Sequence, residues 1–221
     1  MVNVDLRKNA LKLALCAGSV FLITAPKAFA VEVTPGLDLG VEYTQDLLSN
    51  VSGGSSQGSA GIGVGYLSAD LDGRVWGGSE NNKFSFSYQF TTGSSISDDV
   101  GDLQTLDNIE AYNTSTIYSA YFEHDFEDEG SMYRIGMQDY NEVFSAIDTA
   151  AVFVNSSFGI DPTIAQIGPS LFPITTLGAV GRWQSDSGFY ITGGLFNGVS
   201  GDEDHPVGTQ IKFSSANGIL S

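Results

Sequence analysis

The chain has 221 residues, and its 26 acidic and 9 basic residues give a formal net charge of −17. Nucleic acid is excluded as a partner, because so few basic residues could not neutralise its phosphates. The mean hydropathy is +0.02, and after the N-terminal segment no apolar run approaches the ~20 residues of a membrane-spanning helix. If the chain enters a membrane, this average hydropathy predicts a β-barrel, in which apolar and polar residues alternate.

The first 30 residues have the features of a secretory signal peptide. Basic residues precede an apolar stretch from Leu13 to Ile23, and Ala28-Phe29-Ala30 provides a cleavage site of the A-x-A type. Cys16 could suggest lipidation, but Leu15 before it is bulky where lipoprotein signals have a small residue. We therefore predict a signal peptide at residues 1–30, with cleavage after Ala30.

Cleavage would leave a single domain over residues 31–221, which contains no cysteine. The signal segment removes four basic residues and one acidic residue, so this domain keeps 5 basic and 25 acidic residues, a net charge of −20. An exported domain without disulfides has to gain its stability from a sheet or from the membrane.

Eight segments show the period-two alternation of a strand with two unlike faces. In the clearest one, Lys83–Thr92, the aromatic residues at 84, 86, 88 and 90 alternate with polar ones. A soluble sandwich would have to bury the aromatic face in a core, whereas in a transmembrane barrel lipid covers it and the polar face lines a wet lumen. The segments are Leu37–Thr44, Ser59–Asp70, Lys83–Thr92, Thr116–Phe126, Ser131–Asp139, Thr175–Gln184, Phe189–Asn197 and Val207–Ser214.

Two of these segments carry specific expectations about which way side chains point. Within 59–70 the apolar alternation changes phase after Tyr66, which predicts a bulge or the end of the strand there. Within 116–126 the alternation places Tyr118 on the same, lipid-facing side as Ala120 and Phe122.

The connections between the segments alternate in length from the fourth segment onward. Glu127–Gly130 and Ser185–Gly188 are short and end in glycine, as tight turns prefer. Gly93–Ser115 and Tyr140–Ile174 are long. This alternation is typical of outer-membrane barrels, which have short periplasmic turns and long extracellular loops. The connection Leu71–Asn82 is longer than a tight turn and fits this pattern less well.

Three segments, which together cover roughly residues 98–184, resemble the carbohydrate-selective porins of the OprB family. Asp99-Val100-Gly101-Asp102-Leu103-Gln104, with Asn108-Ile109-Glu110-Ala111 after it, is similar to the loop that follows the third strand of that family. The segment from Arg134-Ile135-Gly136-Met137-Gln138-Asp139-Tyr140-Asn141 to Thr149–Ile160 resembles the family's next strand and long loop. Pro173–Ala179 and Arg182-Trp183-Gln184 resemble the strand after it.

The resemblance implies an all-β, antiparallel transmembrane barrel in the bacterial outer membrane, which lets carbohydrates diffuse passively. The expected partners are small neutral sugars, outer-membrane lipid and lipopolysaccharide, and no cofactor is expected. The resemblance implies a barrel of about sixteen strands, whereas this chain supplies about eight strands and lacks a terminal aromatic residue. We therefore expect it to be the N-terminal half of a porin, as a truncated or a partial chain. The sequence leaves open whether the parent protein is a homo-oligomer.

The polar residues opposite the apolar face are the candidates to line the pore. These are Lys83, Gln89, Tyr121, Glu123, Asp125, Arg134, Gln138, Arg182 and Gln184. Arg134 and Arg182 either form a basic patch in the pore wall or belong to scattered ion pairs, and Tyr121 is either a platform for sugars or a packing residue. The loop Tyr140–Ile174 either folds inward and narrows the channel or is an ordinary surface loop.

Motifs of catalysis and metal binding lack their usual context. Gly54–Gly58 matches G-x-S-x-G, but no helix follows it. Gly61–Gly65 lacks the third glycine of a dinucleotide fingerprint. With His124 and His205 as the two histidines, no zinc site of the usual kinds can form. We predict no enzyme and no metal site.

Two further alternatives remain at this stage. Acidic clusters at 98–102 and 202–204 are interpreted as solvated outer loops, with bridging to lipopolysaccharide through divalent cations as the alternative. The alternative to a porin is a small structural or adhesive outer-membrane barrel that does not conduct.

Overall fold

The computed structural model describes residues 12–15, 20–24, 27–127, 130–147, 149–150, 153–158, 170–200, 209, 211 and 216–220. The strands are β1 (Lys12–Leu15), β2 (Val20–Thr24), β3 (Lys27–Thr34), β4 (Leu37–Asn50), β5 (Gly58–Asp72), β6 (Asn82–Gly93), β7 (Ser115–Asp125), β8 (Met132–Gln138), β9 (Thr176–Gln184), β10 (Tyr190–Asn197) and β11 (Ala216–Leu220). The helical turns are η1 (Gly73–Trp76), α1 (Ser97–Val100), α2 (Asn141–Phe144) and η2 (Ser156–Phe158). Among these described residues, no helix has the length and apolar character needed to span a membrane.

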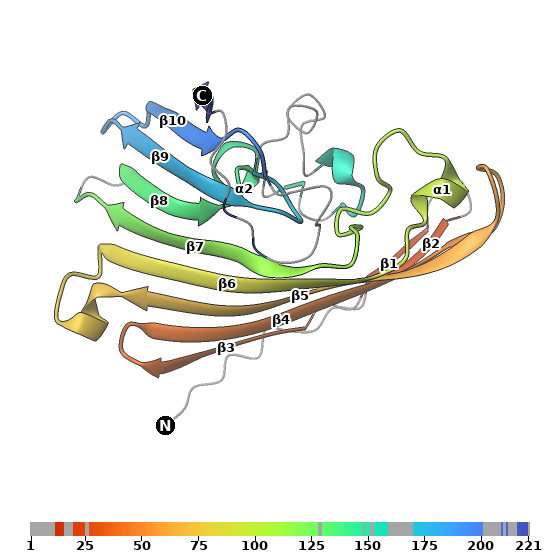
Figure 1. Ribbon diagram of the computed structural model, residues 1–221, viewed down its shortest axis with the longest axis horizontal. Coiled ribbons are helices and arrows are strands. Elements are labelled where there is room, and N and C mark those ends of the chain that lie inside the picture. Colours follow the sequence, from red (N-terminus) through yellow and green to blue (C-terminus); the bar gives the residue numbers. More distant parts are fainter. Residues whose placement is uncertain are drawn as a thin grey trace.

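The strands form one 11-stranded antiparallel sheet in the order β1-β2-β4-β5-β6-β7-β8-β9-β10-β11, and β3 pairs with β4 beside β2. Because the strands pair in an antiparallel way, the prediction of an all-β antiparallel fold is confirmed. In the described part of the chain the sheet is curved but not closed (Figure 1). The strands β4 to β10 correspond to the first seven predicted segments, and β4 continues to Asn50.

Short and long connections alternate from β6 onward, whereas the β4–β5 connection at 51–57 is shorter than the β5–β6 connection at 73–81. The turn at 35–36, the η1 connection at 73–81, and the links β7–β8 and β9–β10 gather at one end, on the left of Figure 1. The long connections that carry α1 and α2 leave from the other end. The 73–81 connection therefore belongs to the end with the short turns, although it is longer than a tight turn.

The two faces of the sheet differ in chemistry. Residues directly opposite each other in an antiparallel pair lie on one face. Lys83 is opposite Glu123, which is opposite Arg134, and this face, here called the inner face, also carries the long connections. Phe84 lies on the outer face, opposite Phe122. Apolar side chains there are exposed, as Leu195 illustrates at 63%, and a soluble monomer rarely exposes an apolar surface of this extent.

The change of phase in β5 does not interrupt the strand. β4 and β5 pair along their full lengths in a single register, so the predicted bulge or strand end after Tyr66 is wrong. Before Tyr66, Ala60 and Ile62 point to the inner face, where they pack against Ile96 of the β6–β7 connection. After Tyr66 the apolar residues of β5, such as Leu67, lie on the outer face. The phase changes because a loop covers one half of the inner face.

A bulge does occur in β7, where the sequence predicted regular alternation. Ser119 is opposite Ser87, but the next pair is Ile117 with Tyr88, so Tyr118 has no opposite residue. The extra residue turns Tyr118 toward the inner face, where its ring lies 5.4 Å from that of Tyr66. The prediction that Tyr118 faces lipid is therefore wrong.

β1, β2 and the first part of β3 lie within the predicted signal peptide, and β2 pairs with β4 at Asp46–Asn50. Cleavage after Ala30 stays a prediction, and it would remove these strands. Most of the predicted segment Val207–Ser214 lies outside the described residues, whereas β11 pairs with β10.

Candidate pore-lining site

All nine predicted pore-lining residues lie on the inner face of the sheet. The strand registers place Lys83, Gln89, Tyr121, Glu123, Asp125, Arg134, Gln138, Arg182 and Gln184 on it. They do not form a single group. The charged residues of β6, β7 and β8 come together, the two central glutamines lie beneath a loop, and the β9 residues lie apart.

Arg134 of β8 is held between two carboxylates. Its Nη2 lies 2.7 Å from Oε2 of Glu123, and its Nη1 lies 3.0 Å from Oε2 of Glu142 in α2. Its guanidinium carbon lies 4.1 Å from the centre of the Tyr121 ring. Of the two interpretations that the sequence left open, the ion pair therefore describes Arg134. This arrangement also attaches α2 to the sheet.

Lys83 extends the same array of charges toward the short turns. Its Nζ donates a hydrogen bond to Asp125 and lies 3.9 Å from Oε1 of Glu123. Glu123 therefore lies between Lys83 and Arg134, and positive and negative side chains alternate across three neighbouring strands. Opposite charges on neighbouring strands attract each other directly across the sheet.

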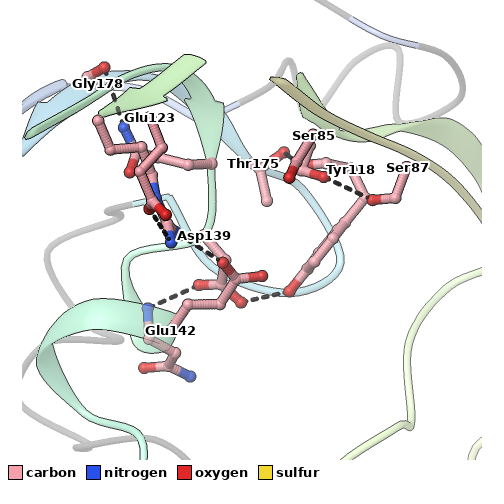
Figure 2. A network of polar contacts seen from close by, with 12 residues as sticks. Ser85, Ser87, Tyr118, Glu123, Asp139, Glu142, Thr175 and Gly178 are labelled. Carbon is pink, nitrogen blue, oxygen red and sulfur yellow. Dashed lines mark hydrogen bonds and ion pairs between the residues drawn. The ribbon is translucent and has the colours of Figure 1, made fainter. Parts of the chain in front are cut away.

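Tyr118 and Asp139 form the centre of a polar network that the sequence did not predict (Figure 2). The Tyr118 hydroxyl donates to Asp139, and the backbone N–H of Asn141 donates to the other carboxylate oxygen at 2.8 Å. Thr175 Oγ1 donates to the carbonyl of Tyr118. Burial raises the pKa of Asp139 to about 6. The signal available in the sequence was an aspartate placed directly after a strand and two residues before an asparagine.

Gln89 and Gln138 are fully buried on the inner face, where Gln89 holds the end of the long loop and Gln138 bonds to the neighbouring strand β9. Gln89 Nε2 donates to the Pro173 carbonyl at 3.1 Å, and Gln138 Nε2 donates to the Gly178 carbonyl at 3.0 Å. Their amides are therefore used in packing, and they do not face open solvent. Of the two alternatives for the loop Tyr140–Ile174, its described residues favour inward folding, because they pack on the inner face. That the loop narrows a channel stays a prediction.

Arg182 has a different environment from that of Arg134. Its Nε donates to Thr192 Oγ1 at 3.1 Å, and its guanidinium carbon lies 5.2 Å from the centre of the Tyr190 ring. Within the described residues it forms no ion pair. Gln184 lies next to it toward the short turns, where its backbone N–H donates to Ser131 Oγ at 2.9 Å.

A cavity of about 550 Å³ adjoins this network on the inner face. Its wall includes the hydroxyl and carboxylate groups of Glu42, Tyr66, Ser68, Ser87, Tyr118 and Glu142. Apolar surface makes up the larger part of the wall, and Ala28, Phe29 and Ala30 of the predicted signal peptide contribute to it. The hydroxyl and carboxylate groups can donate to and accept from a ligand rich in hydroxyls.

The two long connections are joined to each other. The Asn108 backbone N–H donates to the Val154 carbonyl at 2.7 Å, and Ser156 Oγ donates to the Thr105 carbonyl at 2.5 Å. Val154 also packs against the apolar cluster around Ile96. The two loops therefore cover the inner face as one layer.

The serine of the G-x-S-x-G motif has a structural contact. Ser56 Oγ donates to the Asp99 carboxylate, and the backbone N–H of Ser56 donates to the Asp99 carbonyl at 3.0 Å. These bonds fasten the β4–β5 loop to α1. Across the described ranges no group of three or more histidine, cysteine or acidic side chains could hold a metal ion.

Aromatic rings gather on the outer face at the end with the short turns. The His124 ring lies 5.0 Å from that of Phe126 and 5.4 Å from that of Tyr133. Trp183 and Phe189 form a further pair, 6.4 Å apart, at the β9–β10 turn. Aromatic bands of this kind mark the boundary between the apolar core and the headgroups in membrane barrels.

The model of one protein family, described as "Carbohydrate-selective porin, OprB family", matches residues 57–220 of the chain. The chain belongs to the OprB family. The match begins before β5 and ends within β11, so it covers the whole polar network and extends beyond the resemblance at residues 98–184. No curated protein and no solved structure matches the chain. The OprB family is a family of outer-membrane porins, and the membership of this chain in the family accounts for its antiparallel sheet with two unlike faces.

Proposed function

We propose that this OprB chain forms the wall of an outer-membrane channel through which small sugars, neutral ones included, diffuse passively. The observation that carries this proposal is the separation of chemistry between the two faces of one sheet. An exposed apolar outer face suits lipid, and a polar inner face that carries two inward-folded loops suits a restricted aqueous passage.

The outer face supports an orientation in the membrane. The aromatic rings around His124 and Trp183 lie beside the short turns. Short turns are periplasmic in outer-membrane barrels, and the long loops are extracellular. We therefore place the connections that carry α1 and α2 at the outside of the cell.

The inner face supports a substrate rich in hydroxyl groups. Arg134 is paired with Glu123 and Glu142, and Lys83 is paired with Asp125, so these cations are largely neutralised. The cavity beside Tyr118 offers hydroxyl groups instead. Such a wall can exchange hydrogen bonds with a sugar as it replaces the sugar's hydration shell.

Liposome swelling tests the transport proposal. Reconstituted in liposomes as part of a closed barrel, the chain is expected to admit glucose faster than an amino acid or peptide of similar size. The described sheet is open, so the chain by itself is not expected to conduct. Equal rates would contradict carbohydrate selectivity but not a channel. No permeation of any solute would contradict the channel and favour the alternative, a structural barrel that does not conduct.

Labelling of two adjacent residues tests the assignment of faces. Ser87 lies on the inner face and Phe86 on the outer face of β6. In a Cys16→Ser background, a membrane-impermeant maleimide is expected to label Ser87→Cys from water and not Phe86→Cys. Labelling of Phe86→Cys with protection of Ser87→Cys would reverse the two faces and contradict the proposal.

A further inference from the structure

A second, smaller cavity lies on the loop side of the polar network. It has a volume of about 270 Å³ and lies between α2 and the connection that follows it. This volume is below the range of pockets for drug-sized ligands and suits a single sugar ring. Its wall includes Asn108, Asp139, Glu142, Ser145, Phe153 and Phe158. Glu142 also lines the larger cavity beside Tyr118, so it lies between the two.

One wall of this cavity is aromatic and held in place. The rings of Phe153 and Phe158 are stacked with their centroids 4.3 Å apart, and each side chain is about half exposed. Ser156, between them in sequence, donates through its backbone N–H to the Thr105 carbonyl at 3.3 Å, which ties this segment to the other long loop. The face of an aromatic ring carries partial negative charge, so it attracts a cation or a polarised C–H group.

Another wall carries an excess of negative charge. The single positive charge of Arg134 is shared between Glu123 and Glu142. Asp139 adds a further carboxylate, fixed by the Tyr118 hydroxyl. Burial raises the pKa of this carboxyl to about 6, so it remains mostly ionised at pH 7. The cavity therefore has more negative than positive charge around it.

The surrounding loops have the same sign of charge. Residues 94–114 and 139–175 contain no lysine or arginine. Their acidic residues are Asp98, Asp99, Asp102, Asp107, Glu110, Asp139, Glu142, Asp148 and Asp161. Loops of one sign raise the local concentration of an oppositely charged solute and repel solutes of their own sign.

We propose that the cavity between α2 and the Phe153–Phe158 pair is a binding subsite for an amino sugar, whose protonated amine faces Glu142 and Asp139. The sugar ring lies against the two phenylalanines, and its remaining hydroxyls reach Asn108 and Ser145. This inference rests on the proposed function, because it names the class of sugar that the loop side of the channel selects.

Ligand-observed NMR titration of the full chain in detergent micelles at pH 6.5 tests the subsite. The probes are glucosamine, glucose and glucuronate, which are cationic, neutral and anionic forms of a similar ring. We expect glucosamine to bind about tenfold more tightly than glucose, and glucuronate to bind most weakly. Equal affinities for glucosamine and glucose would overturn the proposal.

Two variants and one control assign the effect to this cavity. Glu142→Gln keeps a hydrogen-bonding group beside Arg134, and it is expected to reduce the preference for glucosamine to about twofold. Phe158→Leu is expected to weaken both sugars to a similar extent. Asp186→Asn, an exposed change in the β9–β10 turn, should leave the affinities unchanged. A preference that persists in Glu142→Gln would contradict the assignment.

The outcome can be separated from that of the transport proposal. If glucose enters liposomes but glucosamine binds no better than glucose, the channel stands and the subsite is wrong. If glucosamine binds as expected but no sugar enters liposomes, the subsite stands and the transport proposal is wrong.

Discussion

The guanidinium of Arg134 lies above the ring of Tyr121, 4.1 Å from its centre, while its nitrogens bind carboxylates from two different elements. Glu123 belongs to β7, and Glu142 belongs to α2. Arg134 therefore joins a loop to the wall, and its side chain is only 13% exposed. Removing one member of such a group leaves the remaining charges without compensation.

Arg134→Lys is expected to destabilise the protein by about 1–3 kcal/mol. A lysine keeps the charge, but it lacks the planar fork that binds two carboxylates while stacking on a ring. Urea or thermal unfolding in detergent micelles measures the change.

Arg74→Lys is the matched control for Arg134→Lys. Arg74 pairs with Asp72 at 2.5 Å, but its side chain is 49% exposed at the end with the short turns. Solvent screens such a pair, so no measurable change in stability is expected. Equal destabilisation by both substitutions would show that the ion pairs of Arg134 contribute no more to stability than an exposed pair does.

Tyr118→Phe is expected to destabilise the protein by about 1–3 kcal/mol, because it leaves a buried oxygen of Asp139 without its donor. Tyr133→Phe serves as control, since Tyr133 lies on the outer face opposite His124. Thermal unfolding of the unsubstituted chain and of the two variants in one detergent measures the difference. If Tyr118→Phe behaves like Tyr133→Phe, the hydroxyl contributes nothing to the attachment of the loop.

The faces of most strands could be predicted from the sequence because backbone pleating imposes a period of two. Lys83 and Phe84 therefore point to the predicted sides. The face on which Tyr118 lies could not be predicted, because a single extra residue in β7 moves its side chain from the outer to the inner face. No residue type in the sequence predicts such a bulge. The roles of Asp139 and Glu142 could not be predicted either, because their partners come from other elements and are brought near them only when the loop packs on the sheet.

Gly65→Ala is expected to destabilise the protein by about 1–3 kcal/mol through overpacking on the outer face. Gly65 is opposite both Tyr43 and Phe90, whose rings stack over it with centroids 6.1 Å apart. An added Cβ would lie 2.2 Å from Phe90 Cζ, so that ring would have to move. Unfolding in detergent measures the cost.

Gly181→Ala provides the control on the same face. Gly181 is opposite Tyr133, and an added Cβ would meet no atom within 4 Å. Its effect on stability is expected to stay within about 0.5 kcal/mol. Similar losses at both glycines would mean that the aromatic stack over Gly65 is not the cause.

Two buried carboxyl groups make the attachment of the β6–β7 connection dependent on pH. Asp107 in this connection and Asp46 of β4 are 1% and 2% exposed, and their carboxyl groups interact with each other. Two buried carboxylates repel each other unless one of them carries a proton. Burial, with a smaller contribution from the charge of Asp46, raises the pKa of Asp107 to about 8.

The sign of the pH dependence follows from this raised pKa. The attached connection keeps a proton that the detached one releases above its ordinary pKa of 3.8. Attachment is therefore strongest below this value and weakens as pH rises toward about 8, by up to about 1.4 kcal/mol per pH unit, and then levels off. Glu110 in the same connection adds to the repulsion as the pH rises.

A nitroxide label at Leu103→Cys, in a Cys16→Ser background, reports this change by electron paramagnetic resonance. Leu103 is fully exposed in the same connection, so the label should not disturb packing. We expect the label to be more mobile at pH 9 than at pH 5. Asp107→Asn should remove this difference, because an amide can donate to Asp46 at every pH. Asp98→Asn in α1 changes an acidic residue nearby and should leave the difference intact. A pH response that survives Asp107→Asn would assign the titration to another group.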